Sequence, residues 1–178
     1  MNNKLSIQTI LLHWLTAVPF LAALGIGLYM EDLPNGPDKF ELMANHKSIG
    51  LMVLLIAAIR VLWRVKEGHI SSISKAPFWQ ETMAKVVHYV LLIATILMPV
   101  SGIMMSVGGG RALEFFGIQL IAAGDKIEWL SEIGHTFHGL APKVIMLALF
   151  LHIVGALKHQ FVEKDGTISR MLGKGNKA

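Results

Sequence analysis

The sequence predicts an all-α integral membrane protein, a four-helix bundle with both termini in the cytoplasm. Hydrophobic residues make up 53% of the 178 residues and charged residues only 16%, which is too apolar for an ordinary soluble domain. The apolar residues gather in four runs of about 20 residues, the length that crosses a hydrocarbon core. We expect one transmembrane domain over residues 1–178, with approximate spans at 9–30, 46–65, 86–107 and 138–157.

The first span opens with His13 and Trp14 and contains Pro19. Lys4 is the only charged residue before it, and no A-x-A cleavage pattern follows it, so we expect a retained span and not a signal peptide. The second span follows an expected loop at 31–45 and ends in RVLWRV, whose Arg and Trp residues suit an interface anchor.

The third span opens with His88 and is followed by the longest expected loop, residues 108–137. Within it, we expect the moderately apolar segment 113–123 to lie along the membrane surface and 127–134 to form a short amphipathic helix. The fourth span then begins at His138 and leads into a basic tail.

The Lys and Arg residues set the expected orientation, because cytoplasmic loops carry an excess of them. They concentrate in the loop after the second span and in the C-terminal tail, whereas acidic residues dominate the other two loops. The termini are therefore expected in the cytoplasm. The net charge of +4 follows from this asymmetry, so we expect no nucleic-acid partner.

Five histidines lie near the ends of the spans. His138 and His152 are fourteen residues apart and leave the same face of one helix, about 21 Å apart along its axis. Depth in the membrane pairs His46 with His138 at the outer side. At the inner side it leaves any two of His13, His88 and His152.

The chain contains no cysteine, which excludes Fe–S clusters, thiolate zinc sites and covalently attached haem. Polar side chains inside a membrane are costly unless something binds them, and histidine is a usual axial ligand of haem. The sequence therefore predicts two bis-histidine haems of the b type. Gly50, Gly139 and Gly155 lie near the histidines in sequence and would leave room for a macrocycle.

Two other interpretations compete with the haem prediction. A di-metal carboxylate bundle needs two Glu-x-x-His motifs, and only Glu132 with His135 matches, so we reject it. A haem-free channel, sensor or transporter would have the same topology and would be a colourless protein.

Several motifs together resemble the bacterial di-haem cytochrome b561 family over nearly the whole chain. They are LLHW at 11–14, HKSIG at 46–50, RVLWRV at 60–65, the two histidines of the fourth span, and LKHQF before EKDGTISRML. In that family and in the related cytochrome b subunits of formate dehydrogenase and nickel–iron hydrogenase, the first, second and fourth spans supply the ligands. The resemblance implies His13 with His152 for the inner haem and His46 with His138 for the outer haem. His88 is then left as a quinone-site or structural residue.

The resemblance also implies a function, because one type in this family is a superoxide oxidase. It passes electrons from superoxide at the outer side through both haems to ubiquinone at the inner side. Some relatives have two adjacent histidines after the fourth span, where this chain has His159 and Gln160. His159 and His88 are therefore the candidates for a quinone site.

Charge on the outer side favours two different electron donors. The expected outer loops are acidic overall, which suits a basic periplasmic redox partner and a relay function. Lys47, Lys143 and Arg111 could instead form a local positive entrance that attracts superoxide. We expect superoxide:quinone oxidoreductase activity first, and a relay between quinone and a dehydrogenase or another periplasmic partner as the alternative.

Overall fold

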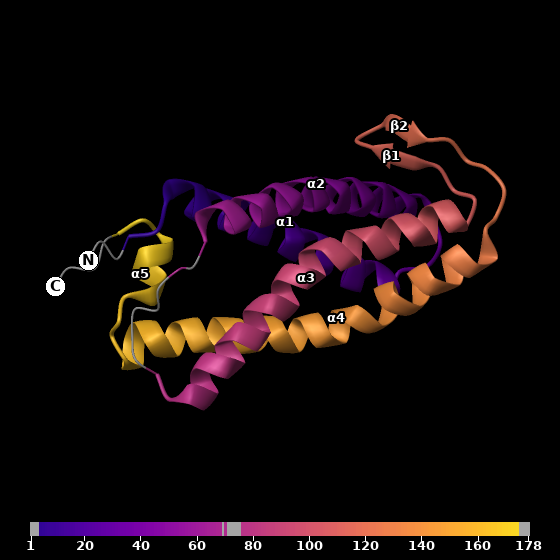
Figure 1. Cartoon of the computed structure of the whole chain (residues 1–178). Helices are drawn as coiled ribbons and strands as arrows, with labels where there is room; N and C mark the ends of the chain where they lie inside the picture. Colours follow the sequence, from indigo (N-terminus) through magenta and orange to yellow (C-terminus); the bar gives the residue numbers. More distant parts are fainter. Residues whose placement is uncertain (1–3, 69, 71–75, 175–178) are drawn as a thin grey trace.

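The computed structural model describes residues 4–68, 70 and 76–174. This part of the chain is mostly helical, with four helices long and apolar enough to cross a membrane, which run alongside one another in an elongated bundle (Figure 1). They are α1 (Ile7–Glu31), α2 (Pro37–Glu67), α3 (Phe78–Gly108) and α4 (Glu128–Leu157). Many large apolar side chains point outward, including Leu62 and Phe150, as expected for surfaces in contact with lipid. The length and composition of these helices indicate a multi-pass membrane protein.

The connection between α1 and α2 is shorter than the sequence predicts. The helix α2 begins at Pro37, so most of the expected loop at 31–45 is helical. Proline suits the first position of a helix because its missing N–H would have no intrahelical partner there. The pattern of Pro34, Gly36 and Pro37 therefore marks a helix start as well as a turn.

The prediction of one long loop at residues 108–137 is also partly wrong. Leu113–Phe115 (β1) and Ile118–Ile121 (β2) pair as an antiparallel hairpin, so the fold is mostly helical and not strictly all-α. Phe116 and Gly117 both have positive φ, 46° and 83°, which is the backbone twist of a tight two-residue hairpin turn. The helix expected at 127–134 is not separate, because α4 already begins at Glu128.

The helices pack most closely as two pairs, α1 with α2 and α3 with α4. Glycine allows the α3 and α4 backbones to meet: a Cβ atom on Gly134 would lie 2.5 Å from the Met105 nitrogen. One on Gly108 would lie 2.4 Å from the Ser131 nitrogen. A central cluster then joins the two pairs, with one buried side chain from each helix: Phe20, Val53, Ala94 and Ile145.

The C-terminal segment closes one end of the bundle. After α4 the chain makes a π-helical turn, Lys158–Val162 (η1), and a short helix, Thr167–Met171 (α5). The Gln160 side-chain oxygen accepts hydrogen bonds from the N–H groups of Ile168 and Ser169, at 2.9 and 3.1 Å. The Trp14 indole N–H donates to the Met171 carbonyl at 2.9 Å, which ties this segment to α1.

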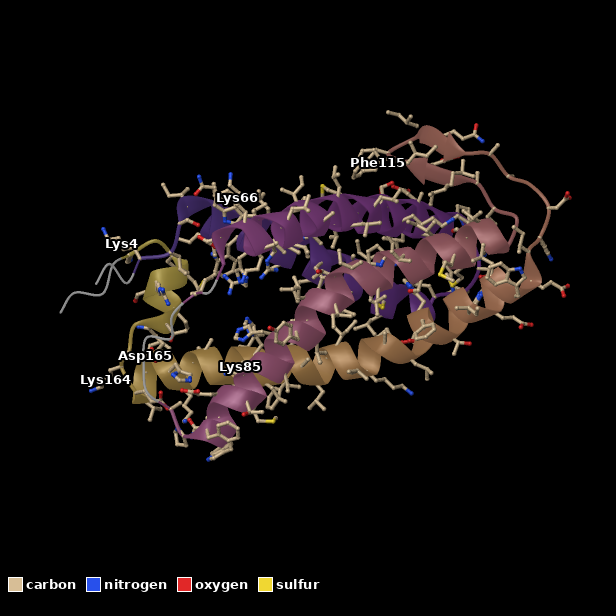
Figure 2. The ribbon with its side chains drawn as sticks, in the orientation of Figure 1. Lys4, Lys66, Lys85, Phe115, Lys164 and Asp165 are labelled. Atoms are coloured by element: carbon tan, nitrogen blue, oxygen red, sulfur yellow. The ribbon has the colours of Figure 1, made fainter. Side chains whose placement is uncertain are left out.

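Both ends of the described chain lie at this end of the bundle (Figure 1). The labelled side chains of Lys4, Lys66, Lys85 and Lys164 lie in the same half of the molecule, and Phe115 of the hairpin lies at the opposite end (Figure 2). We call the end with α5 the inner end and the hairpin end the outer end. Their placement relative to the cytoplasm stays a prediction.

Candidate haem-binding site

Two histidines face each other at the outer end. The ring centroids of His46 on α2 and His138 on α4 lie 5.9 Å apart. The Nδ1 atom of His46 lies 2.9 Å from the Ala23 carbonyl oxygen, and that of His138 lies 3.0 Å from the Met98 carbonyl oxygen. A carbonyl only accepts, so each Nδ1 carries the proton and donates it. Each Nε2 is therefore unprotonated and available to a metal ion.

Each of these rings lies against a glycine of the neighbouring helix. A Cβ atom on Gly27 would lie 3.1 Å from Cε1 of His46, and one on Gly102 would lie 3.1 Å from Cε1 of His138. Gly27 follows Ala23 by four residues, and Gly102 follows Met98 by four residues. A backbone carbonyl and a glycine one turn later thus orient each outer imidazole in the same way.

Three histidines gather at the inner end. The ring centroids of His13 on α1 and His152 on α4 lie 6.3 Å apart, whereas those of His88 on α3 and His152 lie 5.1 Å apart. His13 and His152 are half-buried, and His88 is exposed and bonded to the carbonyl of Ala84 in its own helix. The structure brings together all three inner histidines that depth in the membrane left as alternatives.

The histidine spacing fits bis-histidine ligation of one iron at each end. A metal–nitrogen bond of about 2 Å and about 1 Å from nitrogen to ring centre place two opposed rings about 6 Å apart. The His46–His138 and His13–His152 separations of 5.9 and 6.3 Å agree with this value, and the His88–His152 separation of 5.1 Å is too short. The donor set, neutral imidazoles among apolar helices, is also the usual one for haem b.

His13 differs from the outer histidines in its partner. Its Nδ1 atom lies 3.3 Å from Nη2 of Arg60, not beside a backbone carbonyl. The sequence indicated only an interface anchor at Arg60, so its place beside a candidate ligand was missed. The sequence spacing could have predicted this position, because Arg60 follows His46 by fourteen residues, as His152 follows His138.

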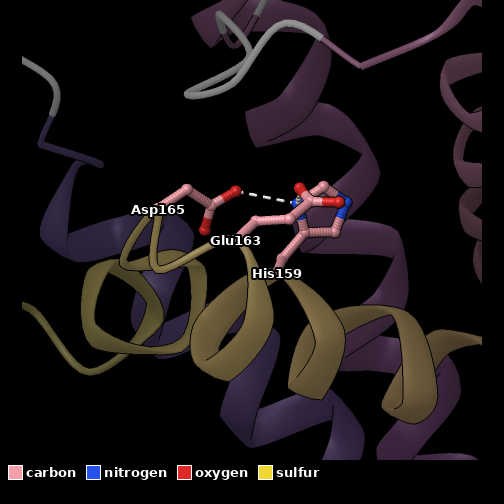
Figure 3. Close-up of side chains that lie close together, drawn as sticks. All are labelled: His159, Glu163 and Asp165. Atoms are coloured by element: carbon pink, nitrogen blue, oxygen red, sulfur yellow. Dashed lines mark hydrogen bonds and ion pairs between the residues drawn. The ribbon is translucent and has the colours of Figure 1, made fainter.

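His159, a candidate quinone residue, is not simply solvated. Its Nδ1 atom lies 2.7 Å from Glu163 Oε2 and 2.8 Å from Asp165 Oδ2 (Figure 3). The other oxygen of Asp165 accepts from the Thr167 N–H at 2.9 Å, which fixes the carboxylate at the start of α5. Gln160, where some relatives have a second histidine, is the residue that binds the α5 backbone.

A cavity of about 500 Å³ lies at the outer end, between α2 and the hairpin. Lys47, next to His46, lines it with Ser48 and Glu114, and Arg111 is close enough to interact electrostatically with Lys47. The Ser48 hydroxyl accepts a hydrogen bond from the Phe116 N–H at 2.9 Å, which holds the hairpin over α2. Lys143 is exposed on α4 and does not line this cavity.

The glycines expected beside the haems give a mixed result. A Cβ atom on Gly50 would meet only Pro99, at 4.0 Å, which is ordinary helix packing. Gly139 and Gly155 have open space around them, so their expected role stays a prediction. The glycines that contact candidate ligands, Gly27 and Gly102, were missed because they lie on the partner helices. The sequence predicts a solvated His69 in the basic loop after the second span, and this residue lies outside the described residues.

Comparison with known proteins agrees with this site. A family model described as prokaryotic cytochrome b561 matches residues 4–174. Cytochrome b561 homolog 2 of Escherichia coli K12 is 30% identical over 168 residues, which cover 91% of this chain and 87% of that protein. Cytochrome b561 homolog 1 of the same organism is 24% identical over 172 residues, covering 96% and 97% of the two chains.

A probable superoxide oxidase of Yersinia pestis is 25% identical over 174 residues and covers 98% of each chain. Family membership implies haem b binding and transmembrane electron transport, in agreement with the histidine groups described above. The chain therefore belongs to the prokaryotic cytochrome b561 family of haem-binding, membrane-spanning electron-transfer proteins.

Proposed function

We propose that this chain is a di-haem electron-transfer protein in which His46 and His138 ligate the outer haem and His13 and His152 the inner haem. The observation that carries the proposal is the presence of two facing ring pairs, 5.9 and 6.3 Å between centroids, at opposite ends of one bundle. Helix α4 contributes one histidine to each pair. Haem iron, when bound, supplies a one-electron centre at each end.

The chain's own contribution is to hold the imidazoles and exclude water between them. The Ala23 and Met98 carbonyls fix the ring orientation at the outer end. The cluster of Phe20, Val53, Ala94 and Ile145 fills the middle of the bundle with apolar side chains. A dry, rigid surrounding limits the reorganisation that accompanies each change of charge.

The donor that we propose is superoxide, and the acceptor is ubiquinone. Two superoxide anions lose one electron each and become O2, while one quinone gains these two electrons and two protons and becomes quinol. The whole-length similarity to a protein named as a probable superoxide oxidase supports the donor. The cavity at the outer end supports it too, because Lys47 lines it and Arg111 lies near Lys47, which gives positive charge for a small anion although Glu114 also lines the cavity.

The inner end suits the quinone half of the reaction, which consumes protons. His159 between Glu163 and Asp165 offers a protonatable group with two carboxylate partners (Figure 3). We propose that this trio supplies protons to the quinone and that His88, beside His152, is a second residue of the quinone site. Lysines at this end agree with a cytoplasmic orientation in the bacterial inner membrane (Figure 2).

The test uses the purified full-length protein in detergent, with haem bound. Superoxide from an enzymatic source is added with ubiquinone, and the haem absorbance and quinol formation are followed together. We expect both to rise and both to be abolished by superoxide dismutase. Haem that superoxide leaves oxidised would contradict superoxide as the donor.

The outer acidic residues favour a second candidate function, a relay for a basic periplasmic redox protein. Eight of them fall in the expected outer segments: Glu31, Asp32, Asp38, Glu41, Glu114, Asp125, Glu128 and Glu132. If this function is correct, membranes should yield a basic redox protein bound to the chain, and high salt should release it. Reduction of the haems by that protein but not by superoxide would establish the relay.

A further inference from the structure

Arg60 points into the inner histidine group. It follows His46 on α2 by fourteen residues, just under four helical turns, so the two side chains leave the same face. His46 faces His138 at the outer end, and Arg60 accordingly reaches the inner end, where Nη2 lies 3.3 Å from Nδ1 of His13. It is also close enough to His88 and His152 to interact electrostatically with both.

Of these two arginines, only Arg64 has an ion pair within the described part of the chain, a long contact with Glu67. None of the ion pairs found there includes Arg60. Arg64 lies one turn closer to the inner end; its Nη1 atom is buried without a hydrogen-bond partner, 4.0 Å from Glu67. The Glu67 carboxylate already accepts hydrogen bonds from the hydroxyl groups of Ser6 and Thr9. Two guanidinium groups on a membrane helix are costly unless an anion meets them.

The Arg60–His13 contact cannot persist when His13 ligates a metal through Nε2. A guanidinium only donates, so Nδ1 of His13 accepts and the ring proton sits on Nε2. Ligation through Nε2 moves the proton to Nδ1, which then repels the Arg60 donor. Arg60 is therefore left with a free donor next to the bound group.

We propose that Arg60 and Arg64 form the anion subsite of the inner haem and bind its two propionate groups. Two guanidinium groups match two carboxylates in charge, and their planar donor pairs match carboxylate geometry. Arg64 lies nearer the end of α2 than Arg60, where charged propionates would gain contact with water. The proposal rests on the assignment of His13 and His152 as inner ligands.

The test compares haem b with its dimethyl ester, which lacks both propionate charges. The full-length chain with His138→Ala, expected to bind only the inner haem, is prepared from haem-limited cells and titrated with each compound. We expect haem b to bind about tenfold or more tightly than the ester, as charge-assisted hydrogen bonds predict. The double variant R60A/R64A should lose most of this preference and R60K/R64K should keep part of it.

Lys66→Ala is the matched control, because it removes an exposed cation from the same end of α2. It should leave the preference for haem b unchanged. An undiminished preference in R60A/R64A would overturn the anion subsite while the ligand assignment stands.

A second titration uses the chain with His138 intact and R60K/R64K, so that the question stays answerable if R60A/R64A does not fold. If R60K/R64K prefers haem b over the ester as strongly as the unmodified chain does, at both haem sites, the anion subsite would also be overturned. Loss of both haems, or retention of both, in His138→Ala alone would instead contradict the proposed function.

Discussion

Gly102 leaves room for the His138 ring across the α3–α4 pair, because a Cβ atom on Gly102 would lie only 3.1 Å from Cε1 of the imidazole. The same ring donates from Nδ1 to the Met98 carbonyl and lies 3.0 Å from the Ser101 hydroxyl. The position of the His138 ring therefore depends on the absence of a side chain at Gly102 as much as on these hydrogen bonds. Gly27 has the same relationship to His46.

Gly102→Ala should displace the His138 ring and weaken the outer haem. The added methyl group needs the ring to move by a few tenths of an ångström, and the Nδ1 hydrogen bond resists that movement. We expect outer-haem occupancy to fall, measured as haem per chain and by the low-temperature absorbance band of each haem. Gly25→Ala is the control, since a Cβ atom there meets nothing within 4 Å. Equal haem content in both variants would contradict the role of Gly102.

Single histidine variants should separate the ligands from the other histidines. We expect one haem per chain in His46→Ala, His138→Ala and His13→Ala, because each removes one axial ligand. His88→Ala should keep two haems, since its ring lies too close to His152 for an iron between them. One haem in His88→Ala and two in His13→Ala would reverse the inner assignment.

Lys47→Glu should slow the reduction of the haems by superoxide. The substitution reverses a charge that lines the outer cavity, and steering of a small anion depends on that local charge. We expect about a tenfold lower second-order rate at low salt, with a smaller difference at high salt because of screening. Lys143→Glu, away from the cavity, is the comparison. If both variants slow haem reduction equally, the overall electrostatic field of the outer end attracts superoxide, and a local entrance at Lys47 does not.

Asp165→Asn should slow quinol formation without slowing haem reduction. Asparagine keeps an acceptor for the Thr167 N–H but removes the charge that faces His159. If the His159 trio supplies protons, the quinone step alone should become slower and more dependent on pH. The measurement is the ratio of quinol formed to superoxide consumed in the presence of excess quinone. A parallel decrease in haem reduction would show that the substitution instead disturbs the inner site as a whole.

Glu67→Ala should destabilise the inner end of the α1–α2 pair. The carboxylate accepts hydrogen bonds from the Ser6 and Thr9 hydroxyls, and Thr9 in turn accepts from the Trp63 indole at 3.1 Å. Since Glu67 is partly exposed, we expect a loss of about 1–3 kcal/mol in the free energy of unfolding. Thermal unfolding in detergent, with exposed Glu31→Ala as the control, measures it. An identical midpoint in the two variants would contradict this prediction.

The sequence alone determined the family, the membrane class and the four apolar helices, and it also narrowed the candidate ligands to five histidines. The family follows from the combined motifs, whereas the other features follow from local composition and from helical spacing. Runs of about 20 apolar residues need a membrane, and a fourteen-residue interval returns a side chain to the same face of a helix. Such rules act within a single helix, so they need no knowledge of its neighbours.

Tertiary structure decided what depends on contacts between helices. Gly27 and Gly102 matter because of rings on other helices, and Arg60 matters because α1 brings His13 to it. The hairpin of β1 and β2 likewise depends on the Phe116–Gly117 turn and on Ser48, which lies far away in the sequence. Periodicity gives the direction in which a side chain leaves its own helix, but only the packed bundle gives the atoms that it meets.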